Sequence, residues 1–444
     1  MDYASMTSLV SPLRELGRTI QAGIEEYIAE LEKATSGSSS APKGRQSPIP
    51  PHSVFEAQKF LINATGRLNS VLLSPKEQLV LLSAQHLEAR ALHIIAAADV
   101  AGIIERQGAG RGMSIRDLAR ETGLEEGKLG RLLRLLCDLG IFKEVRGDVF
   151  ANNDTSVLLA RDENFKAWVM TFGLAMFSGA NELPTHLLSP DGRGHSYDSS
   201  TTALGQCHRF KGGVFQWIGQ KVRVEDLKQG RNGVGVTHDW WSSTHPLNGS
   251  LNGAGNEKDA GIMKDVNHDM ASLESFRSGY PGVYGTLLRD AIKGKADDEL
   301  VERPEMRVFK MAMVGAGEPG LMAEYDDYPW SSLGEATVVD VGSGVGGFSL
   351  RLSKLVPQLN IVLQDLAPLL KEAETVVWPK QHPDAISQRK VRFVPHDFFK
   401  PNPVKGADIY YVRNVLLDWV DADVVCILAN LKASMGTNSR ALIS

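Results

Sequence analysis

Cysteine is scarce in this chain of 444 residues, and its scarcity excludes two classes of protein. The three cysteines, Cys137, Cys207 and Cys426, are far apart in the sequence. Thiols this widely separated form neither a disulfide scaffold nor a cysteine-rich zinc site. Because few and scattered cysteines are typical of proteins in a reducing compartment, we expect a cytoplasmic protein.

Long apolar runs and an excess of positive charge are also missing. No run reaches the ~18 residues that span a bilayer, and the first residues do not follow the charged-then-apolar order of a signal peptide. The 48 basic and 53 acidic side chains give a net charge of -5. This balance disfavours nucleic acid or an anionic membrane as the main partner. The hydrophobic content of 43% is ordinary for a folded protein and excludes wholesale disorder.

Changes in composition and periodicity divide the chain into five predicted segments. They are an N-terminal amphipathic helix (1–35), a Ser/Pro/Gly-rich linker (36–53), a mostly helical domain (54–200), an irregular Gly/Asn-rich insertion (201–300) and an α/β domain (301–444). Within the first segment, Ser11 is expected to cap a helix over 12–33, with Pro12 in its first turn. The apolar residues of this helix recur every three or four positions, which predicts one stripe that packs on the body of the protein or on a second subunit.

Residues 113–150 predict two helices followed by a two-stranded hairpin. Ser114 is placed to cap the first helix, Gly123 and Gly140 close the two helices, and a Gly-Asp turn at 147–148 joins the strands. This order is a winged-helix pattern. A DNA reader exposes basic residues on its second helix, but leucines dominate this one, which favours a dimerisation or scaffold role over DNA binding.

Histidine and tryptophan side chains gather in and beside the Gly/Asn-rich insertion. His208, His238 and His245 could suggest a metal site, and Trp240 and Trp241 an aromatic cage. Their spacing matches no known ligand pattern. We therefore predict no metal.

From about residue 300 onward, short β-branched runs alternate with helical patterns. Strands are expected at 336–341, 359–364, 390–395, 407–412 and from 440 onward, with helices at 348–356 and 421–435. This alternation predicts a parallel, doubly wound, Rossmann-like sheet.

The sharpest motif is the glycine run GSGVGG, which follows the first of these strands. Gly342, Gly344 and Gly346 allow a tight turn and a close approach of the backbone to a ligand, and the helix that follows offers free N–H groups. Asp365, at the end of the next strand, is placed to accept hydrogen bonds from ribose hydroxyls. The pattern predicts an adenosine-containing cofactor.

The glycine spacing alone fits both a nicotinamide dinucleotide and S-adenosylmethionine. Three neighbouring features favour S-adenosylmethionine: Asp340 just before the first glycine, the run His396-Asp397-Phe398, and Arg413 followed by Asp418-Trp419. The catalytic pair of a nicotinamide-dependent oxidoreductase is not found.

Four stretches resemble motifs of the S-adenosylmethionine-dependent O-methyltransferases of the plant caffeate and fungal secondary-metabolite type. They are VVDVGSGVGGFS, LNIVLQDL, HDFFKP and VRNVLLDWVDAD, and the region 80–160 is similar to the dimerisation domain of that family. The resemblance implies a class I methyltransferase fold behind a winged-helix dimerisation domain, a homodimer, S-adenosyl-L-methionine as cofactor and a small hydroxylated aromatic or polyketide-like acceptor. The implied cofactor contacts are Asp340, Gly342, Gly344, Gly346, Asp365, Asp397, Phe398 and Arg413.

Four apolar side chains are candidates for the acceptor pocket. They are Trp168, Phe172, Met311 and Met313. Large aromatic and thioether groups suit a flat apolar ligand. Each of them is equally well explained as part of a helix core.

The chain departs from the family at the position of its catalytic histidine. Leu417 stands immediately before Asp418-Trp419, where the family has that histidine. A phenol, with a pKa of about 10, is ionised to about one part in a thousand at pH 7, and a positioned base contributes about 10²–10⁴ in rate. No catalytic residue is therefore named. Three interpretations remain. Another group, such as His396 or Asn414, serves as the base; the acceptor is more acidic than a simple phenol; or the protein is a catalytically silent cofactor-binding or dimerising protein.

Two further departures concern the length and the insertion. The chain stops at Ser444 in its fifth predicted strand, whereas the sheet of the family continues. Together with the Gly/Asn-rich insertion, this suggests the hypothesis of a mis-assigned reading frame. The other interpretation is that a partner completes the sheet.

Overall fold

The structure, a computed structural model, describes residues 3–37, 51–108, 110–198, 200–228 and 283–444. Its contacts divide the chain into two compact units. Unit 1 comprises Met1–Leu79 and Gly317–Ser444, and unit 2 comprises Val80–Ala316. In the described part of the chain, every helix is too short or too polar to cross a membrane.

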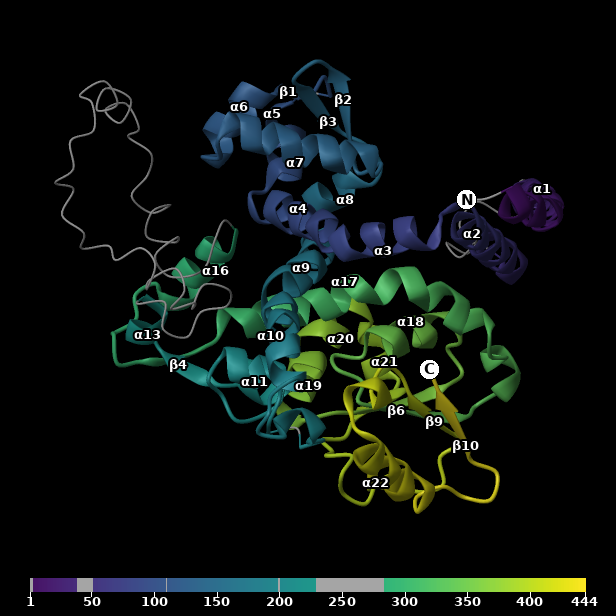
Figure 1. The fold of residues 1–444 in the computed structure, drawn as a ribbon. Helices are drawn as coiled ribbons and strands as arrows, with labels where there is room; N and C mark the ends of the chain where they lie inside the picture. The colour runs from purple at the N-terminus through teal and green to yellow at the C-terminus, as the bar shows by residue number, and fades with distance from the viewer. Residues whose placement is uncertain (1–2, 38–50, 109, 199, 229–282) are drawn as a thin grey trace. The chain divides into compact units, whose positions relative to one another are not determined.

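Unit 1 contains the five-stranded sheet that the sequence predicts (Figure 1). The strand order is β10-β9-β6-β7-β8, and all neighbours pair in parallel. The strands are β6 (Thr337–Val341), β7 (Asn360–Gln364), β8 (Val391–Phe393), β9 (Ile409–Val412) and β10 (Arg440–Ile443). Their β-branched and aromatic residues suit strands that are buried on both faces.

Helices cover both faces of this sheet. They are α18 (Gly347–Leu355), α19 (Ala367–Glu372), the π-turn η4 (Ala373–Val377), α20 (Trp378–Gln381), α21 (Pro383–Ser387) and α22 (Asp421–Lys432). One core lies between the sheet and α18–α21, with Val338, Phe348 and Trp378 among its buried members. The other lies between the sheet and α22, with Val339 and Leu431. Two covered faces confirm the Rossmann-like architecture.

Two N-terminal helices, α1 (Tyr3–Gly37) and α2 (His52–Leu72), also belong to unit 1. Leu16 of α1 is buried, and an added Cβ at Gly23 would lie 3.1 Å from the Phe60 ring of α2. The predicted cap at Ser11 is wrong, because the helix begins eight residues earlier and includes Pro12. An internal proline removes one N–H hydrogen bond and crowds the carbonyl four residues earlier, and here the helix continues through it with helix-forming residues on both sides.

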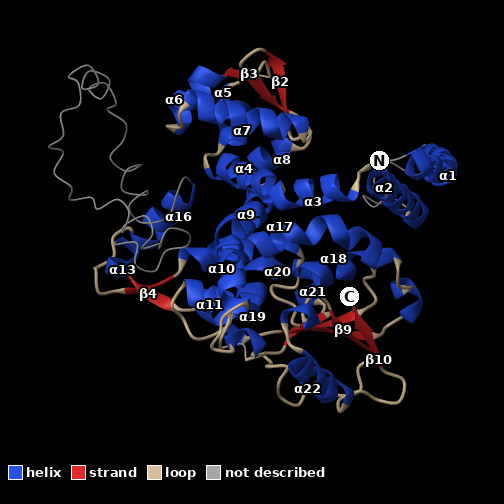
Figure 2. Cartoon of the chain, viewed as in Figure 1, coloured by secondary structure: helices blue, strands red, loops and turns tan. Residues whose placement is uncertain are grey.

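Unit 2 begins within α3 (Pro75–Ala84) and is mostly helical (Figure 2). Its first part contains α4 (His86–Ala97), α5 (Val100–Gln107), β1 (Met113–Ser114), α6 (Ile115–Thr122), α7 (Glu126–Asp138), β2 (Phe142–Arg146), β3 (Val149–Asn152) and α8 (Ser156–Arg161). The strands form a small sheet of order β1-β3-β2. The Asp117 N–H donates to Ser114 Oγ (3.1 Å), and Gly123 closes α6 with a φ of 71°, as predicted.

The second helix of the winged-helix region, α7, is held by the core of unit 2 on its apolar face. Leu129, Leu133 and Leu136 are fully buried. Arg134, one of its basic residues, donates to the carboxylates of Glu144 and Asp148 on the hairpin. Its charge is therefore compensated within the unit, which agrees with a scaffold role rather than contact with DNA phosphates.

The rest of unit 2 follows as a series of short helices and two strands. They are α9 (Glu163–Thr171), the π-turn η1 (Phe172–Met176), α10 (Phe177–Leu187), η2 (Arg193–His195), α11 (Ala203–Cys207), α12 (Val214–Ile218), β4 (Lys221–Arg223), α13 (Val224–Lys228), α16 (Val283–Ile292), β5 (Leu300–Glu302) and α17 (Pro304–Asp326), which continues into unit 1. Strands β4 and β5 pair antiparallel.

The ends of the segment 201–300 differ from the irregular structure that the sequence predicts there. Residues 201–228 and 283–300 contain the short elements given above, and Val222, Val224 and Leu227 are buried in a shared core. The elements within 203–228 have three to five residues, too few for a periodicity to be recognised, whereas α16 has ten. Residues 229–282, including His238, Trp240, Trp241 and His245, lie outside the described residues.

Candidate functional site

The glycine loop between β6 and α18 has the backbone conformation that its composition predicts. Gly342, Gly344 and Gly346 have φ angles of 75°, 58° and 81°, which side chains rarely adopt. An added Cβ would lie 2.6 Å from Val415 at Gly342 and 2.6 Å from Leu363 at Gly346, whereas at Gly344 it would meet nothing within 4 Å. The first and third glycines therefore permit packing, and the second faces open space.

Two residues at the end of β7 hold this loop. The N–H groups of Gly342 and Ser343 donate to Gln364 O (2.8 and 3.0 Å). The Gly344 N–H donates to Asp365 Oδ2 (2.8 Å). The predicted ribose acid and the glycine loop are thus in direct contact, as the motif requires.

Two carboxylates lie beside the loop: Asp340 is buried and Asp365 is half-buried. Burial raises the pKa of Asp340 to about 6, although Ser349 Oγ of α18 donates to its Oδ2 (2.6 Å). Burial also raises the pKa of Asp365, against hydrogen bonds from Gly344 N–H and Leu366 N–H. Burial thus disfavours the charged form of both carboxylates, and positive charge placed nearby would favour it.

Arg413, the predicted basic contact, lies at the end of β9 and is already paired. Its Nε donates to Glu324 Oε2 of α17, which also accepts from Tyr411 OH (3.1 Å). The guanidinium lies 5.9 Å from the centre of the Phe348 ring. Its contact with a cofactor stays a prediction.

The residues predicted to surround an adenine lie on the loop after β8. The His396 N–H donates to Asp365 O (2.9 Å), and Asp397 Oδ1 accepts from the Phe399 N–H (3.0 Å). The Phe398 ring packs edge-on to Trp419 at 5.6 Å. Burial lowers the pKa of His396, so its imidazole is neutral at pH 7. The structure thereby brings this loop to the strand end that carries the ribose acid.

Leu417 is fully accessible at the position where the resemblance expects a histidine. Its side chain is 74% exposed, in the short turn η5 (Leu416–Asp418). Asn414 just before it has a φ of 51°, and burial raises the pKa of the neighbouring Asp418. An aliphatic side chain accepts no proton, so position 417 supplies no base.

Three of the four predicted acceptor-pocket residues lie together in unit 2. Trp168 of α9 and Phe172 have ring centres 4.8 Å apart, and Trp168 and Met311 both pack against one buried cluster. Met313 is 44% exposed and is not among the residues of that cluster. The helical spacing places Met313 on another side of α17 from Met311.

A π-turn interrupts the helix that carries Trp168 and Phe172. Arg90 Nη1 of α4 donates to Gly173 O (2.5 Å), and an added Cβ at Gly173 would lie 2.7 Å from the His93 ring. Burial and the neighbouring Arg90 lower the pKa of His93 to about 4. π-turns within α-helices are frequent at functional sites, and nothing in the local sequence signals this one.

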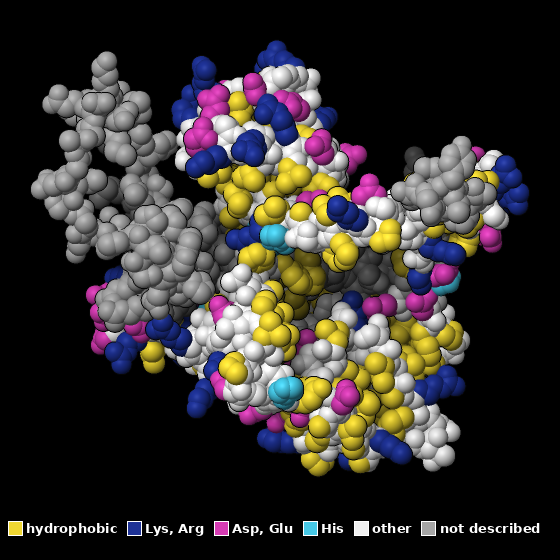
Figure 3. All heavy atoms as spheres, in the orientation of Figure 1, with side chains coloured by type: hydrophobic (Ala, Val, Ile, Leu, Met, Phe, Trp, Pro, Cys, Tyr) yellow, Lys and Arg dark blue, Asp and Glu magenta, His cyan; other side chains and the backbone are white. Residues whose placement is uncertain are grey.

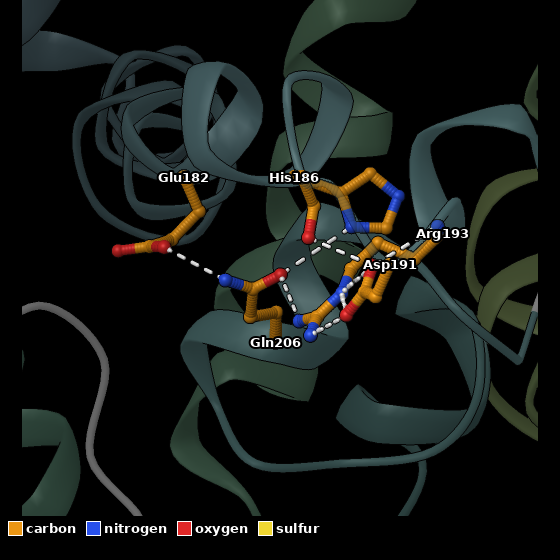
Figure 4. A network of polar contacts seen from close by, with 6 residues as sticks. Glu182, His186, Asp191, Arg193 and Gln206 are labelled. Atoms are coloured by element: carbon orange, nitrogen blue, oxygen red, sulfur yellow. Dashed lines mark hydrogen bonds and ion pairs between the residues drawn. The ribbon is translucent and has the colours of Figure 1, made fainter.

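A second polar cluster in unit 2 was not predicted from the sequence (Figure 4). His186 Nδ1 lies 3.4 Å from Gln206 Oε1, which also accepts from Arg193 Nη1 (3.1 Å), while Gln206 Nε2 donates to Glu182 Oε2 (3.4 Å). Arg193 also pairs with Asp191. These contacts join α10 to α11. Among the described residues, no group of three or more His, Cys, Asp or Glu could hold a metal ion.

The site includes residues that the sequence motifs did not single out. Ser349 holds Asp340, Trp378 Nε1 donates to Val345 O of the glycine loop (3.2 Å), and Gln364 and Asn402 pair beside Asp365. Gln364 directly precedes the predicted acid, which is the one signal that could have identified it. The others depend on tertiary contacts.

Comparisons with known proteins agree with this geometry. A family model for the O-methyltransferase domain matches residues 323–444, and one for the O-methyltransferase dimerisation domain matches residues 81–162. O-methyltransferase gedA of Aspergillus terreus is 35% identical over 96% of this chain and 78% of its own length. O-methyltransferase tpcA of Aspergillus fumigatus is 34% identical over 98% of this chain and 80% of its own length.

Solved structures share the fold. OxaC in complex with SAH and oxaline matches with a TM-score of 0.53 and 18% identity, over 96% of this chain and 84% of OxaC. The mitomycin 7-O-methyltransferase MmcR matches with a TM-score of 0.50 and 19% identity, over 85% of this chain and 80% of its own. The fungal relatives at 34–35% identity and the two family models show that the chain belongs to the S-adenosylmethionine-dependent O-methyltransferase family.

Proposed function

We propose that this chain methylates a hydroxyl group on a small aromatic or polyketide-like molecule, with S-adenosylmethionine as the methyl donor. When bound, this cofactor supplies an electrophilic methyl group on a sulfonium ion. The observation that supports the proposal most is the placement of two carboxylates, the buried Asp340 and the half-buried Asp365, beside a glycine loop that leaves open space at Gly344. A cationic nucleoside fits this combination of negative charge and space.

The residues around the loop have distinct proposed roles. Asp365 would accept hydrogen bonds from the ribose hydroxyls, and Gly344 leaves space where a side chain would intrude. Asp397 and Phe398 would contact the adenine, and the charge of Asp340 would favour the cationic end of the ligand. Gly342 and Gly346 would keep the loop closely packed. Arg413 would border the site through its ion pair with Glu324.

The chemistry of the acceptor follows from position 417. Methyl transfer requires an electron-rich oxygen, and Leu417 cannot remove a proton from a hydroxyl. An acceptor whose hydroxyl is already ionised near pH 7 needs no base. We therefore propose an acidic phenol or enol rather than a simple phenol.

The acceptor contacts are proposed from unit 2. Trp168 and Phe172 form an edge-on ring pair, and Met311 packs against the same buried cluster as Trp168. Such a group suits a flat aromatic ligand. Met313 is kept as a candidate because its side chain is exposed.

A homodimer is proposed from the match to a dimerisation domain and from exposed apolar residues. In α3, Leu79, Leu81 and Leu82 are 70%, 57% and 68% exposed. Hydrophobic side chains are visible on the face of the molecule drawn in Figure 3. Apolar surface of this kind is typical of subunit interfaces. Light scattering after gel filtration should give twice the chain mass.

A cytoplasmic location is proposed from the thiols. Cys137, Cys207 and Cys426 are all free. Free cysteines suit a reducing compartment.

Calorimetry followed by a transfer assay tests the function. The purified chain should bind S-adenosylmethionine in a saturable way and should then methylate phenols or enols of low pKa faster than phenols of pKa near 10. Binding without transfer to any acceptor would favour a catalytically silent protein. Absence of binding would overturn the proposal.

A further inference from the structure

Gln364 and Asn402 form a closed pair of hydrogen bonds at the end of β7, one residue before Asp365. Gln364 Nε2 donates to Asn402 Oδ1 (2.9 Å), and Asn402 Nδ2 donates to Gln364 Oε1 (2.7 Å). The two residues are 1% and 2% exposed. Because a buried amide is costly unless it is hydrogen-bonded, one arrangement of this pair is strongly favoured.

This pair closes one end of the loop that carries Asp397 and Phe398. The other end is fixed by the His396 N–H, which donates to Asp365 O (2.9 Å). The last residue of β7, Gln364, and the residue that follows it, Asp365, therefore hold the two ends of the loop. The loop cannot move relative to Asp365 without breaking one of these connections.

Gln364 also contacts the glycine loop through its backbone. Its carbonyl oxygen accepts from the N–H groups of Gly342 and Ser343 (2.8 and 3.0 Å). One residue thus connects the glycine loop, the ribose acid and the loop expected at the adenine. Asn402 is fixed from its own side, because its Oδ1 accepts from the Val404 N–H (2.9 Å) and its backbone oxygen accepts from Ser434 Oγ (3.1 Å).

We infer that Gln364 and Asn402 are positioning residues for cofactor binding, whose paired amides set the spacing between the Asp365 carboxylate and the loop of residues 396–402. The inference rests on the proposed function, because it requires the nucleoside of S-adenosylmethionine to contact both. Two directional hydrogen bonds fix distance and orientation, whereas an apolar pair of similar size would fill the space without fixing either. Displacement of a contact by about 1 Å can cost as much as 100-fold.

The first experiment separates positioning from folding with the double variant Gln364→Leu/Asn402→Leu. Replacing both partners by apolar groups leaves neither side-chain amide unpaired but removes the acceptor of the Val404 N–H, so the double variant should stay folded with a modestly lower unfolding temperature than the wild type. Its Kd for S-adenosylhomocysteine, measured by calorimetry, should rise about tenfold or more. A folded double variant that binds with the wild-type Kd would overturn the inference.

The matched control is Asn360→Leu at the opposite end of the same strand. Asn360 Nδ2 donates to Glu335 O (3.2 Å), so this change also removes an amide hydrogen bond of β7. The control should bind S-adenosylhomocysteine as the wild type does. A comparable loss of affinity in the control would contradict a specific role of the pair.

A second set of variants keeps the amide groups and changes only the length of the side chains that carry them. Gln364→Asn shortens the connection and should weaken binding of S-adenosylhomocysteine, and the exchange Gln364→Asn/Asn402→Gln should restore it to within about threefold, since the summed length is unchanged. Equal affinity of Gln364→Asn and the wild type would overturn the inference, and so would failure of the exchange to rescue. A wild-type chain that does not bind S-adenosylhomocysteine would instead overturn the proposed function itself.

Discussion

In unit 1, the candidate ligand groups are held by the backbone and by short hydrogen bonds. The glycine loop is fixed by Gln364 O and the Asp365 carboxylate, and its glycines adopt positive φ angles. In unit 2, the candidate acceptor groups are held by side-chain packing, since the Trp168 and Phe172 rings are in contact and Trp168 and Met311 pack against one buried cluster. Groups held by the backbone place the cofactor, the same ligand in every reaction, accurately. Packed side chains can be exchanged for others that suit a different acceptor.

The two units should therefore respond differently to substitution. Changes in the loop and strands of unit 1 should alter cofactor affinity or the chemical step. Changes in the packing of unit 2 should alter stability or acceptor binding and leave cofactor affinity unchanged.

The largest effect is expected for Leu417→His in unit 1. A histidine at this exposed position can accept the proton of a weakly acidic acceptor, and a positioned base contributes about 10²–10⁴ in rate. The kcat for a phenol of high pKa should rise, while the kcat for an acceptor that is already ionised should change little. Equal gains on both kinds of acceptor would contradict the role assigned to position 417.

A loss of stability confined to unit 2 is expected for Asp99→Asn. Asp99 pairs with Lys166 of α9 (3.0 Å), whose side chain is 5% exposed, and with Arg106 (2.9 Å); in the part of the chain that the structure describes, Lys166 then retains its pair with Glu163 (2.7 Å). Weakening a buried ion pair in this way costs about 3 kcal/mol, measured by urea unfolding. Calorimetry on the folded variant should give the wild-type affinity for S-adenosylhomocysteine. A loss of affinity would contradict the claim that substitutions in unit 2 leave cofactor binding unchanged.

Two glycine substitutions compare packing with ligand space inside unit 1. Gly342→Ala should destabilise the protein by about 2–3 kcal/mol, because its φ is unfavourable and the new Cβ would lie 2.6 Å from Val415. Gly344→Ala has the φ cost of about 1 kcal/mol only, but its Cβ enters the open space. Gly342→Ala should unfold at a lower temperature than Gly344→Ala. When the affinity of the folded variants for the cofactor is measured, Gly344→Ala should show the larger loss.

The pH dependence of unit 1 should reveal Asp340. Because burial raises its pKa to about 6 from 3.8, the folded state binds this proton more tightly than the unfolded state does. The contribution of Asp340 to stability is therefore most favourable below about pH 4 and is lost as the pH rises through about 6. Asp340→Asn should be more stable than the wild type at pH 7.5, by as much as about 3 kcal/mol for a pKa raised by about two units, and the difference should vanish near pH 4. A constant difference from pH 4 to 8 would refute this.

The smallest effect is expected for Phe172→Leu in unit 2. Loss of the ring contact with Trp168 should cost about 0.5–1.5 kcal/mol in acceptor binding, measured as a higher KM for the acceptor. The Kd for S-adenosylhomocysteine should not change. A change in that Kd with a normal acceptor KM would argue against an acceptor role for this residue.

The same contrast explains how much of the molecule could be predicted from the sequence. The strands, the glycine loop and Asp365 are recognisable because positive φ angles and buried β-branched runs leave a local signature in the residue types. The pairing of Gln364 with Asn402 and of Arg413 with Glu324 joins residues 38 and 89 positions apart, so no local pattern reveals it. The cap at Ser11 was wrongly predicted because favourable helix residues on both sides outweighed Pro12. The short elements near residues 203–228 were missed because a few residues carry no period.

Calorimetric titration of S-adenosylmethionine into the wild-type chain and into Asp365→Ala tests the central claim most directly. We predict saturable binding to the wild type and a loss of at least about 100-fold in Asp365→Ala, with both proteins folded. Equal binding by the two proteins, or none by the wild type, would contradict the assignment of the nucleoside to the glycine loop and Asp365.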